Sequence, residues 1–187
     1  MRGLSLLFCL CASLANAAPE RYVLDAARSD VGFTYSFEGT EKAGKMPVQS
    51  AVLLIDLDNV PASQVTVTLN AGAARAGFIF ATEVMKGPKV LDTSRHPVIR
   101  FQSTSFQGDL RGATVTGNLT LRGVTRQVTL NAGLYRQRGT ELGDRDNLTV
   151  LLTGTINRNE FGAVGFPDYV GPDIGLRVLA RITRQAP

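Results

Sequence analysis

Small polar and apolar residues alternate along much of this chain, most clearly over residues 114–121. Val115, Leu119 and Leu121 fall on one face of an extended segment there, and the intervening threonines and asparagine fall on the other. Gly123 then supplies the backbone freedom for a tight reversal, after which the alternation resumes. The pattern predicts an antiparallel β-hairpin with one apolar and one polar face.

Further segments repeat this pattern or form a short apolar run, and Gly, Pro, Asn or Asp separates them. These segments cover residues 31–37, 50–57, 65–69, 98–106, 148–156 and 174–182. Together with the hairpin they give about eight predicted strands, a series that fits either a sandwich or an up-and-down barrel. Periodicity alone does not choose between the two. Gly39, Gly44 and Pro47 predict a glycine-rich loop after the first of these strands.

The alternation is lost between residues 71 and 92, which is where we expect a helix. Thr82 can cap a short turn through Glu83 and Met85, and the Gly87-Pro88 pair can end it. The sequence therefore predicts one short helical insert, around residues 82–91.

The first seventeen residues have the features of a secretory signal peptide. Arg2 provides a basic start, residues 4–14 are mostly apolar, and Ala15-Asn16-Ala17 fits a small-x-small cleavage site. The apolar run is too short to span a bilayer, and we expect no membrane span elsewhere. We therefore predict a signal peptide at 1–17 and a single exported domain at 18–187. Both cysteines of the chain lie in the segment that would be removed, so an apolar core must stabilise the domain without disulfides.

The distribution of charge and the scarcity of catalytic residues argue against several classes of function. The formal net charge is +4, and the basic residues are scattered rather than clustered, which argues against nucleic-acid binding. The single histidine, His96, directly precedes Pro97, and no Gly-x-Ser-x-Gly motif accompanies it. One histidine and no remaining cysteine also argue against a zinc or copper site. We expect no catalytic residue, metal or conventional cofactor.

Aromatic residues are spread along the whole chain, although tryptophan is absent. One interpretation is ordinary filling of the core. The other is that several aromatic rings line an apolar lumen, because an eight-stranded barrel is just wide enough to be filled by side chains or to hold one small ligand. The candidates for such lumen contacts are Phe33, Tyr35, Phe37, Phe78, Phe80, Phe101, Phe161, Phe166 and Tyr169.

Several short motifs, in this order and spacing, resemble those of one known family. They are Tyr22-x-Leu24-Asp25, Met85-Lys86-Gly87, His96-Pro97, Gly117-x-Leu119-Thr120-Leu121-Arg122-Gly123-Val124-Thr125 and Asn157-Arg158-Asn159-Glu160-Phe161-Gly162. The last is similar to an Arg-x-acid-Phe-Gly element. Over about residues 22–182 the chain resembles the YceI-like family of exported, polyisoprenoid-binding, lipocalin-like proteins.

The resemblance implies an extended, eight-stranded antiparallel barrel with a helix near one end, located in the periplasm. It also implies an isoprenoid lipid, such as a quinone or a polyprenyl chain, held in the lumen without covalent chemistry. The physical case agrees, because burial of hydrocarbon contributes about 0.8 kcal/mol per CH₂ group and needs no acid, base or metal.

Two other functions remain open at this point. One is a ligand-free interaction module, whose barrel is plugged by its own side chains and whose exposed apolar patch or homodimer face acts instead. The other is a hydrolase centred on His96.

Overall fold

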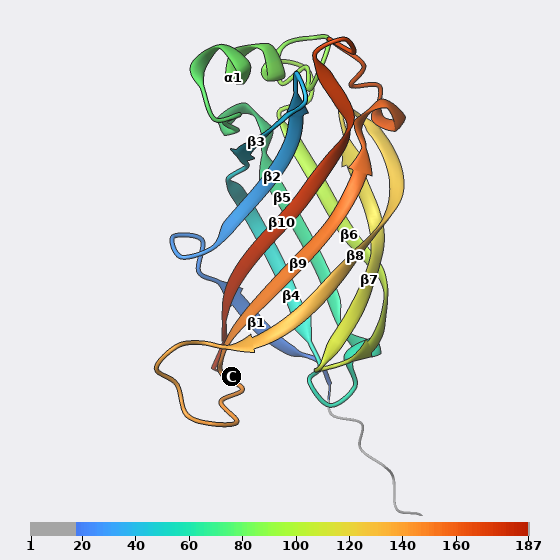
Figure 1. Ribbon diagram of the computed structural model, residues 1–187. Helices are drawn as coiled ribbons and strands as arrows, with labels where there is room; N and C mark the ends of the chain where they lie inside the picture. The colour runs from blue at the N-terminus through green and yellow to red at the C-terminus, as the bar shows by residue number, and fades with distance from the viewer. Residues whose placement is uncertain (1–17, 187) are drawn as a thin grey trace, which may run out of the picture.

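The computed structural model describes residues 18–186 and shows an elongated barrel of antiparallel strands (Figure 1). The signal peptide expected at residues 1–17 lies outside this range. The strands are β1 (Glu20–Leu24), β2 (Asp30–Phe37), β3 (Thr40–Lys45), β4 (Val48–Ile55), β5 (Gln64–Asn70), β6 (Val98–Asp109), β7 (Gly112–Leu121), β8 (Val124–Arg136), β9 (Asn147–Asn157) and β10 (Val170–Arg184). A helix, α1 (Ile79–Lys86), and three short 3₁₀ segments, η1 (Val60–Ala62), η2 (Ala71–Ala73) and η3 (Arg158–Phe161), complete the chain.

Eight of the strands form a closed ring. Their order is β1-β4-β5-β6-β7-β8-β9-β10, and β10 returns to β1 through the pairs Tyr22↔Arg184, Val23↔Thr183 and Leu24↔Ile182. The expected eight-stranded antiparallel barrel with one helix is therefore confirmed. The closing pairs distinguish a barrel from a sandwich, which the alternation pattern alone did not do.

The two remaining strands extend the barrel wall at one end. Strand β10 is 15 residues long, and beyond its short pairing with β1 it pairs with β2, from Leu179↔Asp30 to Val170↔Phe37. Strand β3 then pairs with β2. The sequence had predicted a glycine-rich loop in place of β3, and that prediction was wrong.

A close approach to Phe33 explains why β3 contains a glycine at position 44. A Cβ atom at Gly44 would lie 2.1 Å from the Phe33 ring, so only glycine fits there. The end of β3 is fixed by a two-way backbone bridge, in which Lys45 N–H donates to Arg75 O at 2.8 Å and Arg75 N–H donates to Lys45 O at 2.9 Å.

Helix α1 lies across the same end of the barrel (Figure 1). It begins three residues before the predicted insert at 82–91, and its last residue, Lys86, lies five residues before the predicted end. Gly87 of the Gly-Pro pair is its C-cap. Thr82 is not the N-cap, which is Phe78. The Thr82 hydroxyl instead donates to Phe78 O at 2.9 Å and accepts from Ala76 N–H at 3.0 Å. Within residues 18–186, no helix is both long and apolar enough to cross a bilayer.

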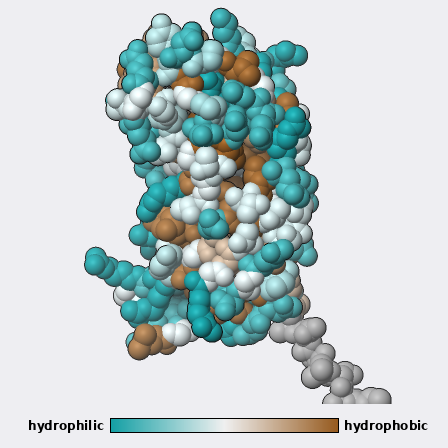
Figure 2. All heavy atoms as spheres, turned by 45° about the vertical axis from the view of Figure 1, so that its right-hand side comes forward, coloured by the Kyte–Doolittle hydropathy of each residue, from teal (hydrophilic) through white to brown (hydrophobic). Residues whose placement is uncertain are grey.

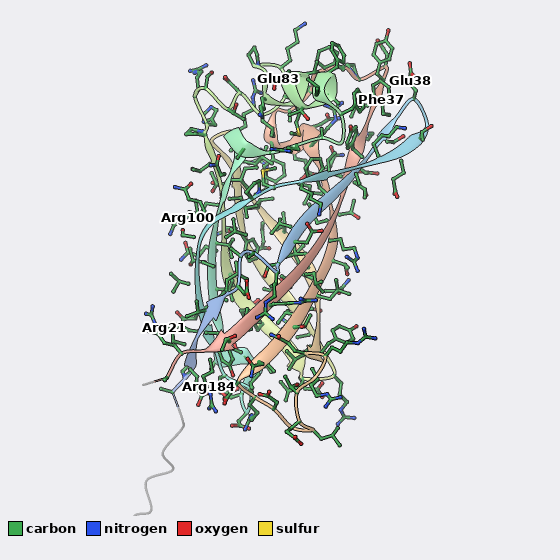
Figure 3. The ribbon with its side chains drawn as sticks, turned by 90° about the vertical axis from the view of Figure 1, so that its left-hand side faces the viewer. Arg21, Phe37, Glu38, Glu83, Arg100 and Arg184 are labelled. Carbon is green, nitrogen blue, oxygen red and sulfur yellow. The ribbon has the colours of Figure 1, made fainter. Side chains whose placement is uncertain are left out.

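The opposite end is closed by a buried tyrosine and several ion pairs. Tyr22 is 2% exposed, and its hydroxyl donates to Arg145 O at 2.7 Å. Close by, Arg184 pairs with Glu20 at 2.8 Å and with Asp146. Figure 3 shows Arg21 and Arg184 at this end, far from Phe37, Glu38 and Glu83 at the α1 end. The two ends therefore differ in chemistry.

Phe161 provides a test of packing at the α1 end, because it is fully buried in a cluster that includes Leu121 and Ile156. We expect Phe161→Ala to lower the free energy of unfolding by about 3–5 kcal/mol through the cavity that it creates. Phe166→Ala, at a ring 38% exposed, serves as the control and should cost about 1 kcal/mol or less. Urea unfolding of both variants measures the difference, and equal losses would contradict the assignment of Phe161 to the core.

Tyr22 predicts a dependence of stability on alkaline pH. Burial, followed by the nearby Glu20 carboxylate, raises the pKa of its phenol above 10.0. The contribution of the Tyr22 phenol to the free energy of unfolding is therefore complete below the pKa that this phenol has in the unfolded chain. It is lost as the pH rises through the higher pKa that the phenol has in the folded protein. We expect Tyr22→Phe to cost about 1 kcal/mol near pH 7 through loss of the hydrogen bond. Above pH 10 its unfolding free energy should fall less steeply than that of wild type, as denaturant titrations at a series of pH values will show. Parallel slopes would refute the assignment.

Candidate functional site: an apolar lumen and an aromatic vestibule

The barrel encloses an apolar cavity of about 290 Å³, which we call the lumen. All eight strands of the ring, together with β2, contribute side chains to its wall. Representative members are Val65, Val67 and Leu69 of β5 and Val115, Leu119 and Leu121 of β7. The apolar face of the hairpin recognised in the sequence is therefore the face that points inward.

Two local features shape the middle of the lumen. A Cβ atom at Gly117 would lie 2.5 Å from the Phe101 ring, so this glycine leaves the space that the ring occupies. The pairing of β6 with β7 also shifts between Ser103 and Ser105. This bulge reverses the parity of the strand. Phe106 therefore faces the lumen together with Phe101, although residues five positions apart in a regular strand lie on opposite faces.

A second cavity, of about 340 Å³, lies at the α1 end, and we call it the vestibule. It is lined by β2, by the first turns of α1 and by the loop that precedes β10. The lining residues are Phe33, Tyr35, Phe37, Glu38, Ala76, Phe78, Phe80, Ala81, Val84, Met85, Val90, Arg158, Gly165, Phe166, Tyr169, Val170 and Ile174. Phe33, Met85, Val90, Arg158 and Ile174 also line the lumen, so the two cavities are adjacent and share this junction.

The aromatic residues predicted as lumen contacts separate into three groups. Phe33 lines both cavities, and Phe101 lines the lumen. Tyr35, Phe37, Phe78, Phe80, Phe166 and Tyr169 line the vestibule rather than the lumen. Phe161 lines neither cavity, because it is 0% exposed within the core. The placement of Phe161 corrects the prediction.

The prediction missed the aliphatic side chains that make up most of the lumen wall. Ala132 and Leu130 of β8, and Leu152 of β9, are examples. Their signal was present in the alternation of the strands, since residues two apart share a face. What the sequence lacked was the direction of that face, because either face of an isolated strand can point inward.

The vestibule reaches solvent through aromatic side chains. Phe80 is 72% exposed and Tyr169 is 52% exposed, although both also line the cavity, and the neighbouring Ile79 is 85% exposed. Figure 2 shows hydrophobic side chains at the surface among hydrophilic ones in the half of the molecule that carries α1. Phe37 and Phe78 pack edge to face, with ring centroids 6.2 Å apart. Apolar aromatic side chains therefore surround the opening of the vestibule to solvent.

Arg158 is the charged side chain at the junction of the two cavities. It belongs to η3, is 6% exposed, and donates to four backbone carbonyls. These bonds are Nε to Gly171 O at 2.9 Å, Nη1 to Ala163 O at 2.5 Å, Nη1 to Gly165 O at 2.7 Å and Nη2 to Val170 O at 2.8 Å. Burial lowers the pKa of its guanidinium. The bonds hold the loop between η3 and β10 against the mouth of the barrel.

His96 lies away from both cavities. It precedes β6, and its ring covers Gly123, where a Cβ atom would be 2.8 Å from His96 Cε1. In the part of the chain that the structure describes, no cluster of three or more His, Cys, Asp or Glu residues could hold a metal ion. The chemistry that the two cavities offer is apolar contact, aromatic stacking and one buried positive charge.

Comparison with solved structures agrees with the observed fold. The chain is similar to BcnA of Burkholderia cenocepacia, with a TM-score of 0.74 and 17% identity over 85% of this chain and 99% of that one. It is also similar to a polyisoprenoid binding domain from Saccharophagus degradans, with a TM-score of 0.65 and 12% identity over 89% of this chain and 99% of that one. At these identities the similarity establishes the fold alone.

Sequence comparison finds relatives in bacteria. A UPF0312 protein of Pectobacterium atrosepticum is 29% identical over 130 residues, which are 70% of this chain and 67% of that protein. Protein YceI of Escherichia coli O17:K52:H18 is 35% identical over 82 residues, which are 44% of this chain and 43% of the relative. The YceI-like domain family itself matches residues 22–182. The chain therefore belongs to the YceI-like family.

Proposed function

We propose that this protein binds and carries an isoprenoid lipid, such as a quinone or a polyprenyl chain, with the hydrocarbon tail in the lumen. The observation that carries the proposal is an apolar cavity to whose wall every strand of the ring contributes aliphatic side chains. Such a cavity offers a hydrocarbon chain burial without any polar group to satisfy. The similar Saccharophagus degradans domain, which is described as polyisoprenoid binding, gives further support.

The energetics favour a tail of several isoprene units. Each CH₂ group that leaves water contributes about 0.8 kcal/mol. Ordering of the chain and the lost freedom of association offset much of this gain, so short tails bind weakly. Binding of this kind is reversible and requires no catalytic residue, and we propose a carrier rather than an enzyme.

The proposed location is the periplasm. It rests on the signal peptide expected at residues 1–17, which would export the domain through the membrane in which isoprenoid lipids reside. The aromatic vestibule then serves as the entrance, because its exposed rings offer an apolar path between solvent and lumen.

The proposal predicts that protein purified from its own host carries a lipid. We expect organic extraction to release an apolar molecule, and native mass spectrometry to show it bound one per chain. The apolar wall retains such a molecule through purification, because dissociation would return its hydrocarbon surface to water. Repeated preparations without any extractable molecule would count against the carrier function.

A substitution in the lumen separates a carrier from a plugged interaction module. Ala132 lines the lumen midway along β8, and we expect Ala132→Phe to abolish lipid binding by occupying the cavity. Its stability should change little, because the ring enters the cavity rather than the packed core. In a plugged barrel the same ring would cost about 1–3 kcal/mol.

Asn131→Phe is the matched control, because Asn131 is the preceding residue on β8 and its side chain is exposed. We expect this variant to retain lipid. Displacement of a neutral fluorescent apolar probe measures binding, and urea unfolding measures stability. Undiminished binding by Ala132→Phe would exclude the lumen as the site.

A further inference from the structure

The junction between lumen and vestibule contains a positive charge without a counter-charge. Arg158 lines both cavities and is 6% exposed. Throughout residues 18–186, no ion pair includes Arg158. Buried charges in proteins are ordinarily paired, because removal of an ion from water is costly. The carbonyl oxygens around Arg158 satisfy hydrogen bonds, but they leave its net charge in place.

The guanidinium also retains hydrogen-bonding capacity. An arginine side chain carries five N–H donors. Arg158 uses four of them on the carbonyls of Ala163, Gly165, Val170 and Gly171. One N–H on Nη2 therefore has no acceptor among the residues that the structure describes. A fixed positive charge with a spare donor is suited to an oxygen that carries negative charge.

The other residues of the junction offer no competing polar group, and Glu38, which lines the vestibule outside the junction, is exposed to solvent. Phe33, Met85, Val90 and Ile174 are apolar and surround the boundary that Arg158 shares with them. An ammonium group placed here would meet a like charge and no acceptor side chain. A hydrocarbon end would gain nothing from Arg158. The charge therefore discriminates between head groups, whereas the aliphatic wall does not.

We infer that Arg158 selects the head group of the ligand, and that the preferred ligand is an amphiphile with a hydrocarbon tail in the lumen and an anionic oxygen, of a carboxylate or a phosphate, at the junction. This inference rests on the proposed function, because it assumes a tail in the lumen. It adds the class of head group, the residue that recognises it and the orientation of the ligand, with the head toward the vestibule.

Four probes with one tail test the head group directly. They are farnesoic acid, farnesyl monophosphate, farnesol and farnesylamine, each titrated against a bound neutral fluorescent probe at pH 7.5 below its micelle concentration. The acid and the phosphate are anions and the amine is a cation at this pH. We expect both anions to bind about tenfold or more tightly than the amine, with the alcohol between them. The acid and the phosphate arms also distinguish a fatty carboxylate from a prenyl phosphate. Equal affinity for the amine and both anions would overturn the inference.

Two arginine variants separate recognition from loop anchoring. Arg122 also donates to carbonyls of this end, to Gly162 O and to Pro88 O at 2.7 Å, but it lines neither cavity. We expect Arg158→Met to lose the preference for anions over the amine while farnesol still binds. Arg122→Met should keep the preference even if its stability falls. Loss of the preference in both variants would assign it to the fold of the loops and overturn the role of Arg158. The wild-type series decides the inference if Arg158→Met does not fold.

Failure of the carrier function and failure of head-group selection by Arg158 give different experimental results. If no farnesyl probe binds and Ala132→Phe has no effect, the lumen is not a lipid site and the proposed function fails. If all four probes bind alike and Ala132→Phe abolishes their binding, the carrier function stands and the inference about Arg158 fails.

Discussion

Three residue pairs join β1 to the C-terminal end of β10 and turn an open sheet into a ring. Backbone hydrogen bonds along the remaining strands fix the wall, but only this closure gives the wall an inside. Once the ring is closed, every inward position faces other inward positions across a narrow space. Aliphatic residues at those positions exclude water, and small residues leave part of the bore unfilled. These are Gly32, Ala51, Ala132, Ala163 and Ala180. The cavity is thus a consequence of closure together with incomplete filling.

The two ends of the barrel are built for different tasks. At one end Tyr22 is buried beneath the loop that carries Arg145, and Arg184 joins the two chain ends through ion pairs. Exposed ion pairs contribute little to stability, but together with the hydroxyl of the buried Tyr22 they make this end of the barrel polar. At the other end lie α1 and the loop after η3. Their exposed aromatic rings surround the opening of the vestibule. The apolar, aromatic opening therefore lies at the α1 end, whereas the opposite end is polar.

The segment from Arg158 to Phe161 couples stability to the site. Phe161 packs into the core and anchors η3, while Arg158, three residues earlier, gathers carbonyls of the following loop around its guanidinium. Charge-assisted hydrogen bonds of this kind order a loop that has little regular structure of its own. The same arrangement leaves a positive charge beside two apolar cavities. The group that orders this loop therefore also places a buried charge at the junction of the two cavities.

The alternation of apolar and polar residues by itself determined most strands, their antiparallel pairing through tight turns and the apolar face of each, because side chains of a strand alternate strictly. It could not determine the closure through β1, since pairing with a distant strand leaves no local pattern. It also missed β3, in which the Phe33 ring occupies the space that a side chain at position 44 would need. The sequence pointed to aromatic residues as ligand contacts, and tertiary structure divided them among lumen, vestibule and core. Which way a face points, and whether a buried arginine finds a partner, depends on residues far apart in the chain, so only the folded barrel decided these features.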